Sequence, residues 1–130
     1  MSAIPKPGAV IFAKNVAAMA AFYATVFSLS LKHSEPEKVV LESATLMLVV
    51  HGIPEEIAEN IVITQPPQLR DNTALKLFLP VESIAVARAV AAASGGAIED
   101  ESYEWSAGNF RACDGFDPEG NVFQVRELIK

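Results

Sequence analysis

Short apolar runs and alanine-rich segments alternate along this chain, and the same order occurs twice. The first cycle begins with the apolar run GAVIFA at residues 8–13, which is rich in residues that favour strands. An alanine-rich segment at residues 16–27 follows, with its larger apolar residues at helical spacing, and Asn15 in front of it is a good N-cap. The pattern predicts a strand followed by a helix.

The second cycle repeats these signals in the same order. The apolar run ALKLFLP at residues 74–80 precedes Ser83, another suitable N-cap, and the alanine-rich segment 84–94 follows. Two consecutive glycines, Gly95 and Gly96, then end the predicted helix. A repeat of this kind decides the fold class, because each copy is one structural unit.

Runs typical of β-strands, separated by turn residues, follow each predicted helix. They lie at residues 30–34, 38–43 and 45–51 in the first half, and at 97–101, 109–115 and 121–129 in the second. The chain is therefore predicted to be an α+β protein of two βαβββ modules, with curved mixed sheets that enclose a cleft. We expect one domain over residues 1–130, with module one at about 8–51, a linker at 52–73 and module two at about 74–129.

The net charge and the cysteine count limit which partners the protein can bind and which cellular compartment suits it. The 130 residues carry a formal net charge of -6, which disfavours binding to the phosphates of nucleic acid. Cys113 is the only cysteine, so a disulfide within the chain and a cysteine-rich zinc site are both excluded. We expect a cytoplasmic protein with no signal peptide and no membrane span, since no apolar run approaches the required length.

The paired βαβββ pattern resembles the vicinal oxygen chelate superfamily, which includes glyoxalase I, extradiol dioxygenases and the bleomycin- and fosfomycin-resistance proteins. Two stretches carry most of the resemblance: VIFAKNVAAMAAFYATVF at residues 10–27, and DPEGNVFQV at residues 117–125 with its DP-x-GN turn. The stretch LFLPVESIAVARAVAAASGG at residues 77–96 is similar to the start of the second module. The resemblance covers nearly the whole chain.

The resemblance also implies four metal-ligand positions, usually occupied by His, Glu or Gln. The corresponding residues here are Gly8, Met47, Lys76 and Gln124. Glycine has no side chain, a thioether suits hard metals poorly and a lysine ammonium repels a cation, so only Gln124 is a reasonable ligand. We expect neither a metal nor another cofactor. The histidines, His33 and His51, lie outside the four positions, and solvated or hydrogen-bonded roles suit them better than a two-ligand site.

Alternation along the strands predicts which side chains share the face of the cleft. The four sets are Gly8, Val10 and Phe12; Thr45, Met47 and Val49; Lys76, Phe78 and Pro80; and Val122, Gln124 and Arg126. From these the predicted ligand-binding residues are Phe12, Met47, Lys76, Phe78 and Gln124. Each of the apolar ones also has an ordinary alternative as a core residue, and Lys76 has one as a solvent-exposed residue.

Two further candidates come from the stretch YEWSAGNFRACDG at residues 103–115. In drug-binding members of the superfamily this region often carries a Trp-Gly-x-Arg-like pattern, which the stretch loosely resembles. Trp105 is predicted to stack on a flat ligand, and Arg111 to pair with an anion or cap a ring. The alternatives are that Trp105 covers a sheet edge and that Arg111 forms a surface ion pair with Glu101 or Glu104.

The leading functional prediction is a glyoxalase/bleomycin-resistance-like protein that binds a small organic molecule in a metal-free cleft. One alternative is a metal-independent isomerase or lyase that uses Lys76 or a neighbouring acid, with Gln124 as an oxyanion partner. Another is an accessory domain whose cleft is filled. Relatives commonly pair modules across a two-fold axis, which implies a homodimer.

Overall fold

The computed structural model describes residues 4–130, which form two β-sheets with one main helix on each. The first module consists of β1 (Gly8–Ala13), α1 (Val16–Val26), β2 (Ser30–Glu35), β3 (Lys38–Glu42) and β4 (Met47–Gly52). Its strands lie in the order β1-β4-β3-β2, with β1 parallel to β4 and the other pairs antiparallel. The predicted βαβββ pattern of this half is confirmed.

The second module repeats this plan with more strands. It consists of β5 (Leu77–Pro80), α3 (Ile84–Ala93), β6 (Ala97–Ile98), the 3₁₀ helix η1 (Glu101–Tyr103), β7 (Trp105–Ala107), β8 (Phe110–Phe116) and β9 (Val122–Leu128). Its sheet has the order β5-β9-β8-β6, and β7 also pairs with β8. The α+β fold class is confirmed, with two sheets of four and five strands that do not close into a barrel.

Both helices begin where the sequence indicates, because side chains satisfy their free backbone amides. The Asn15 side-chain oxygen accepts a 3.0 Å hydrogen bond from Ala18 N, and Ser83 Oγ accepts one of 3.2 Å from Val86 N. At the start of each helix, a glutamate of the second module accepts further hydrogen bonds from backbone amides. Glu119 accepts from the amides of residues 14 and 15, and Glu127 accepts from Ile84 N.

Local details of the second module differ from the sequence-based expectation. The strand predicted over 74–80 begins only at Leu77, because Arg70 of the linker forms the β-bridge to Asn121 beside the start of β9. The strand predicted over 97–101 stops after Ile98, where Asp100 accepts a hydrogen bond from Ser102 N and starts η1.

The short strand β7 was not predicted. It pairs with β8 through a tight turn at Gly108, whose φ of 56° lies in the left-handed region that glycine adopts without strain. This turn places Trp105 opposite Ala112 of β8. A residue expected in a loop is therefore part of the second sheet.

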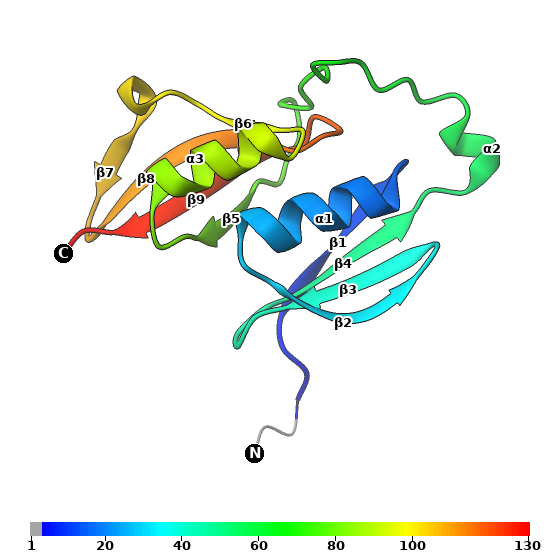
Figure 1. The fold of residues 1–130 in the computed structure, drawn as a ribbon, viewed down its shortest axis with the longest axis horizontal. Coiled ribbons are helices and arrows are strands. Elements are labelled where there is room, and N and C mark those ends of the chain that lie inside the picture. The colour runs from blue at the N-terminus through cyan, green and yellow to red at the C-terminus, as the bar shows by residue number, and fades with distance from the viewer. Residues whose placement is uncertain (1–3) are drawn as a thin grey trace.

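The linker crosses from the first sheet to the second around the start of α1 (Figure 1). It contains the four-residue helix α2 (Glu55–Ala58), which has no buried residue. Within residues 4–130, none of the helices combines the length and the apolar character that crossing a membrane requires.

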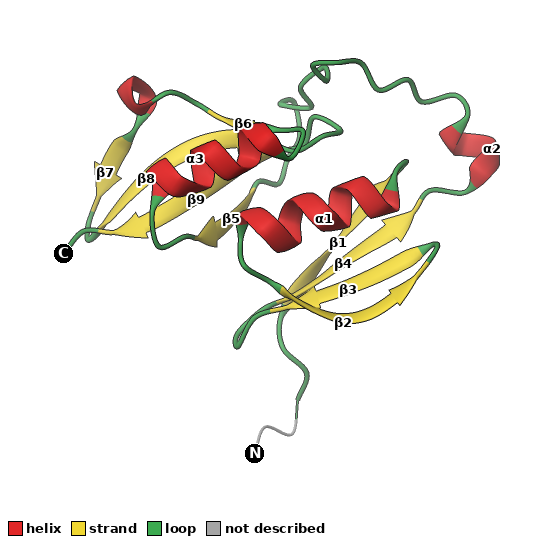
Figure 2. Ribbon diagram, in the orientation of Figure 1, coloured by secondary structure: helices red, strands yellow, loops and turns green. Residues whose placement is uncertain are grey.

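The core joins the two modules rather than filling each separately. Three aromatic residues of the α1 region, Phe22, Tyr23 and Phe27, pack against Phe123 of β9 with ring centroids 5.3–6.2 Å apart. The two main helices also contact each other and lie on the same side of the sheets, as Figure 2 shows. The opposite faces of both sheets are therefore free of helices, and we call them the first and second open faces.

Candidate functional site

The first open face carries the side chains that the alternation predicts. Gly8 lies opposite Met47, Val10 opposite Val49 and Phe12 opposite His51. The intervening β4 residues are buried toward α1. Phe12 remains 58% exposed, and its ring centroid lies 5.9 Å from that of His51. This face therefore presents an aromatic and aliphatic surface that no helix or strand within residues 4–130 covers.

The second open face is defined by the ladders around β9. Phe78 of β5 lies opposite Gln124, and Asp114 of β8 flanks Gln124 on the other side. Phe78 is 53% exposed and Trp105 is 45% exposed, so two aromatic side chains again face outward. Trp105 also forms an edge contact with Phe110, with centroids 6.0 Å apart.

The structure thus distributes the predicted site residues over two sheets. Four of them belong to the second open face, by ladder register or by their contacts there: Lys76, Phe78, Trp105 and Gln124. Phe12 and Met47 belong to the first open face. β1 and β5 each lie at one edge of their sheet, and no ladder between residues 4 and 130 joins them.

Both polar groups predicted on the second open face already have partners. The Lys76 ammonium lies 2.8 Å from Asp114 Oδ2, and Gln124 Oε1 accepts a 2.7 Å hydrogen bond from Arg126 Nε. Asp114 Oδ1 is buried without a hydrogen-bond partner among the described residues. A ligand on this face would therefore meet the Gln124 amide group and Arg126.

Arg111 lies on the opposite side of β8. Its Nε is 3.6 Å from Glu104 Oε1 and its Nη1 is 3.7 Å from Glu127 Oε2, toward the side covered by α3. Arg88 of α3 approaches Glu104 more closely, at 2.6 Å. The geometry thus agrees with the ion-pair alternative for Arg111 and separates it from Gln124.

The predicted site residues did not include Phe110, Asp114 and Arg126 of the second open face. The alternation of β9 placed Arg126 on the correct face. The side chains that β8 contributes to this face were not predicted, because the apolar pattern of β8 alone does not indicate its pairing register with β9. Only the ladder shows that Asp114 stands beside Gln124.

The residues present do not fit the metal centre that the resemblance implies. At position 8 a Cβ atom would lie 2.0 Å from the carbonyl oxygen of Met47, so a ligand side chain there requires the backbone to move. Lys76 is held by Asp114, and the Gln124 oxygen is held by Arg126. Nor do His, Cys, Asp or Glu residues gather in threes at any metal-binding position within residues 4–130.

A buried polar cluster lies apart from the open faces, where the turn before β9 meets α1. Asp117 is fully buried and accepts hydrogen bonds from the Tyr23 hydroxyl at 2.7 Å, from the Asn121 side chain at 2.8 Å and from two backbone amides. Burial raises the pKa of Asp117 despite these bonds. Burial, followed by the Asp117 charge, also raises the pKa of Tyr23.

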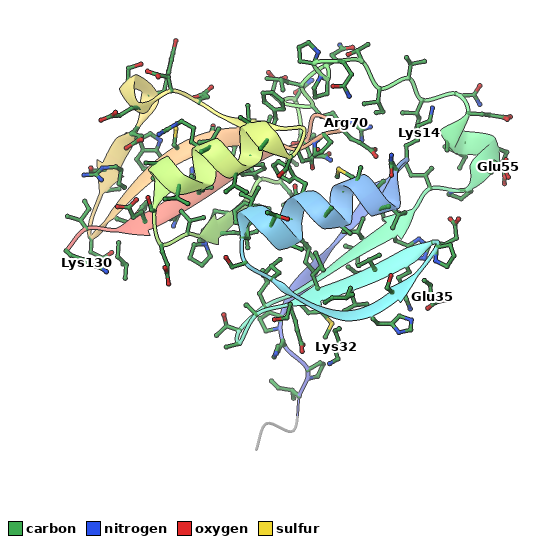
Figure 3. The ribbon with its side chains drawn as sticks, in the orientation of Figure 1. Lys14, Lys32, Glu35, Glu55, Arg70 and Lys130 are labelled. Atoms are coloured by element: carbon green, nitrogen blue, oxygen red, sulfur yellow. The ribbon has the colours of Figure 1, made fainter. Side chains whose placement is uncertain are left out.

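A cavity of about 880 Å³ adjoins this cluster, between the start of α1, the linker and Glu119. Lys14, in the turn between β1 and α1, and Glu55 of α2 border it, as labelled in Figure 3. Its most buried polar group, the Glu119 carboxylate, already binds two backbone amides, at 2.9 and 2.7 Å. This leaves the cavity without a buried group free for a ligand, so we regard the open faces as the better candidate site.

Comparison with known proteins agrees with this architecture. The family described as Glyoxalase-like domain matches residues 8–126. A comparison with curated proteins gave no match.

Several solved structures share the fold at low sequence identity. The glyoxalase/bleomycin resistance protein/dioxygenase family enzyme from Burkholderia phytofirmans PsJN has a TM-score of 0.69 and 20% identity, covering 94% of this chain and 97% of that one. A glyoxalase-related enzyme from Fulvimarina pelagi has a TM-score of 0.66 and 16% identity, covering 95% and 87%.

A third example is the fosfomycin resistance protein from Listeria monocytogenes, solved with Mn(II), with a TM-score of 0.63 and 13% identity over 96% of this chain and 90% of that one. At these identities the likeness shows the fold alone. Together with the match to the family over residues 8–126, it establishes that this chain belongs to the glyoxalase-like domain family of the vicinal oxygen chelate superfamily.

Proposed function

We propose that the protein binds a small organic molecule at its open sheet faces, without a metal ion. The observation that carries the proposal is the aromatic surface left uncovered there: Phe12, Phe78 and Trp105 are 58%, 53% and 45% exposed. Ligand sites are typically apolar and aromatic walls with a few polar groups that fix orientation. Gln124 and Arg126 supply those groups on the second open face.

The absence of a metal from this proposal rests on the chemistry of the residues present. Of the four positions discussed above, one lacks a side chain and lacks space for one, and another is a thioether. Sequestration of a ligand needs only a shaped surface with matching polarity. The free thiol of Cys113 also agrees with a reducing compartment, and we place the protein in the cytoplasm.

We further propose that a second copy of the chain completes the site. The edges of β1 and β5 are unpaired, and exposed sheet edges favour association with another chain. In this homodimer the first module of one protomer meets the second module of its partner and turns two open faces into one cleft. A stable interface needs about 800 Å² per partner, roughly a tenth of the 8191 Å² surface of the chain.

The enzymatic alternative has less support from the geometry. An isomerase or lyase that uses Lys76 as a base and Gln124 as an oxyanion partner needs both groups free. Lys76 is in an ion pair with Asp114, and the Gln124 oxygen is bound to Arg126. Binding without catalysis requires neither group to be released.

Fluorescence offers a direct test, because Trp105 is the only tryptophan. In a screen of aromatic metabolites and planar drugs, binding compounds should change Trp105 emission saturably. Calorimetry, which does not need the tryptophan signal, should show that Trp105→Ala weakens them about 2- to 12-fold, as expected for one aromatic contact of about 0.5–1.5 kcal/mol. Tyr103→Ala is the matched control, since Tyr103 is 65% exposed in the neighbouring η1.

Native mass spectrometry gives an independent readout. A small molecule retained by the purified protein should be lost on mild denaturation and should compete with hits from the screen. If retained or screened ligands bind equally well to the wild-type protein and to Phe12→Ser, Phe78→Ser and Trp105→Ala variants, the open faces are not the site.

A further inference from the structure

Arg126 of β9 is held in an unusual setting on the second open face. Its guanidinium carbon lies 3.6 Å from the centre of the Phe78 ring and 4.3 Å from that of the Phe110 ring. Its Nε donates the 2.7 Å hydrogen bond to Gln124. Two rings and one amide therefore fix the guanidinium, while Nη1 and Nη2 form no hydrogen bond or ion pair with residues 4–130.

The charge of Arg126 is also uncompensated on this face. The other cation there, Lys76, is neutralised by Asp114 at 2.8 Å. Glu127, the next residue along β9, points to the opposite side, where it meets Arg111 and accepts a hydrogen bond from Ile84 N. Partly buried cations in proteins are usually paired, so an orientated guanidinium without a counter-ion is a natural oxyanion site.

The neighbouring strands place the aromatic side chain of Trp105 within reach of a small molecule bound to Arg126. Trp105 lies opposite Ala112, and Ala112 lies opposite Arg126, so the three occupy one row across β7, β8 and β9. Adjacent strands are about 4.8 Å apart, which puts the backbones of Trp105 and Arg126 roughly 10 Å apart. Ala112 lies between them in the ladder and is fully buried, so the exposed surface of this row belongs to its two larger neighbours.

We propose that Arg126 anchors the oxyanion, such as a carboxylate, of a flat apolar small molecule whose body lies against the exposed side chains of Phe78 and Trp105. This assignment rests on the proposed function and names the chemical class of its ligand. The planar guanidinium offers two parallel N–H donors that match a carboxylate. The net charge of -6 opposes an anion only weakly, because salt screens charges beyond about 8–10 Å.

The test compares ligands that differ only in charge. Binding of 1-naphthoate, 1-naphthamide and 1-naphthylmethylamine to the full chain is measured by calorimetry and by ligand-observed NMR. The carboxylate should bind at least tenfold more tightly than the amide, since hydrogen bonds to charged groups exceed neutral ones by this order. The advantage should shrink as salt is raised from 20 to 500 mM.

Substitutions then assign the preference to one residue. Arg126→Met should abolish the advantage of the carboxylate over the amide, while Arg126→Lys should keep part of it through charge alone. Arg111→Met is the matched control, because it removes the same charge from the other side of the sheet and should leave the preference unchanged. Circular dichroism and the midpoint of urea unfolding establish that each variant is folded.

The outcomes separate this inference from the function on which it rests. If the naphthalene ligands bind but the carboxylate has no advantage, or if its advantage persists in folded Arg126→Met, Arg126 only packs between the rings and the inference is wrong. If none of the three compounds binds and the wider aromatic screen also finds no ligand, the proposed function itself fails and the inference with it.

Discussion

The hydroxyl group of Tyr23 donates a 2.7 Å hydrogen bond to Asp117 Oδ2, joining residues 94 positions apart in the sequence. Tyr23 belongs to α1 of the first module, and Asp117 belongs to the turn before β9 of the second. Both are buried, at 1% and 0% exposure. This bond, together with the packing of Phe123 on α1, fixes how the two modules lie relative to each other.

Tyr23→Phe should lower the free energy of unfolding by about 1.5–3 kcal/mol, because it removes a hydrogen bond to a buried charged group. The ring itself is retained, so the aromatic packing is unchanged. Urea unfolding followed by circular dichroism measures the loss. Tyr103→Phe, at a tyrosine that is 65% exposed, should change stability by less than about 0.5 kcal/mol. Equal effects of the two changes would contradict the assignment.

Asp117 should make a distinctive contribution to the pH dependence of stability. Burial raises the pKa of Asp117 above its usual value of 3.8, so the folded state keeps a proton that the unfolded chain has lost. The stability due to this group is therefore fully present below pH 3.8 and falls as pH rises through the higher pKa of the folded state.

The difference in unfolding free energy between the wild type and Asp117→Asn isolates this effect, since other carboxyl groups titrate in both proteins. It should decrease as pH rises from about 3.8 and then become constant. A difference that instead grows with pH over this range would mean that the hydrogen bonds from Tyr23 and Asn121 outweigh burial.

The proposed homodimer predicts a mass of about twice 13.9 kDa by light scattering at micromolar concentration. Phe12→Glu should shift the protein toward the monomer, because it places a charge on the apolar wall of the cleft that the partner's second open face is proposed to enclose. Phe12 is 58% exposed within one chain, so the folded monomer should keep its circular dichroism. Ile57→Glu, on the exposed face of α2, serves as a control that should leave the mass unchanged.

Elemental analysis after mild dialysis should find no stoichiometric zinc, iron, nickel or manganese. The expectation follows from the four positions discussed above, where the structure leaves no space for a side chain at Gly8 and pairs Lys76 with Asp114. Addition of Mn²⁺ or Zn²⁺ should likewise leave the unfolding temperature unchanged. One tightly bound metal ion per chain would overturn this part of the proposal.

Much of the local structure could be predicted from the sequence because the signals are local. Asn15 and Ser83 cap the helices they precede, since a cap depends on amides only a few residues away. The alternation of apolar residues placed Phe12, Phe78 and Gln124 on open faces, since side chains of a strand point to alternate sides. The fold class followed from the repetition of these signals.

The site depended on relationships that no local pattern contains. The register between β8 and β9 decides that Asp114 stands beside Gln124 and that Arg111 points away, and register is set by packing of the whole sheet. The position of Arg126 between two rings brings together three separate strands. The sequence by itself therefore determined the elements and their faces, while only the tertiary structure decided which side chains meet, because long-range pairing is chosen by the burial and hydrogen bonding of the entire chain.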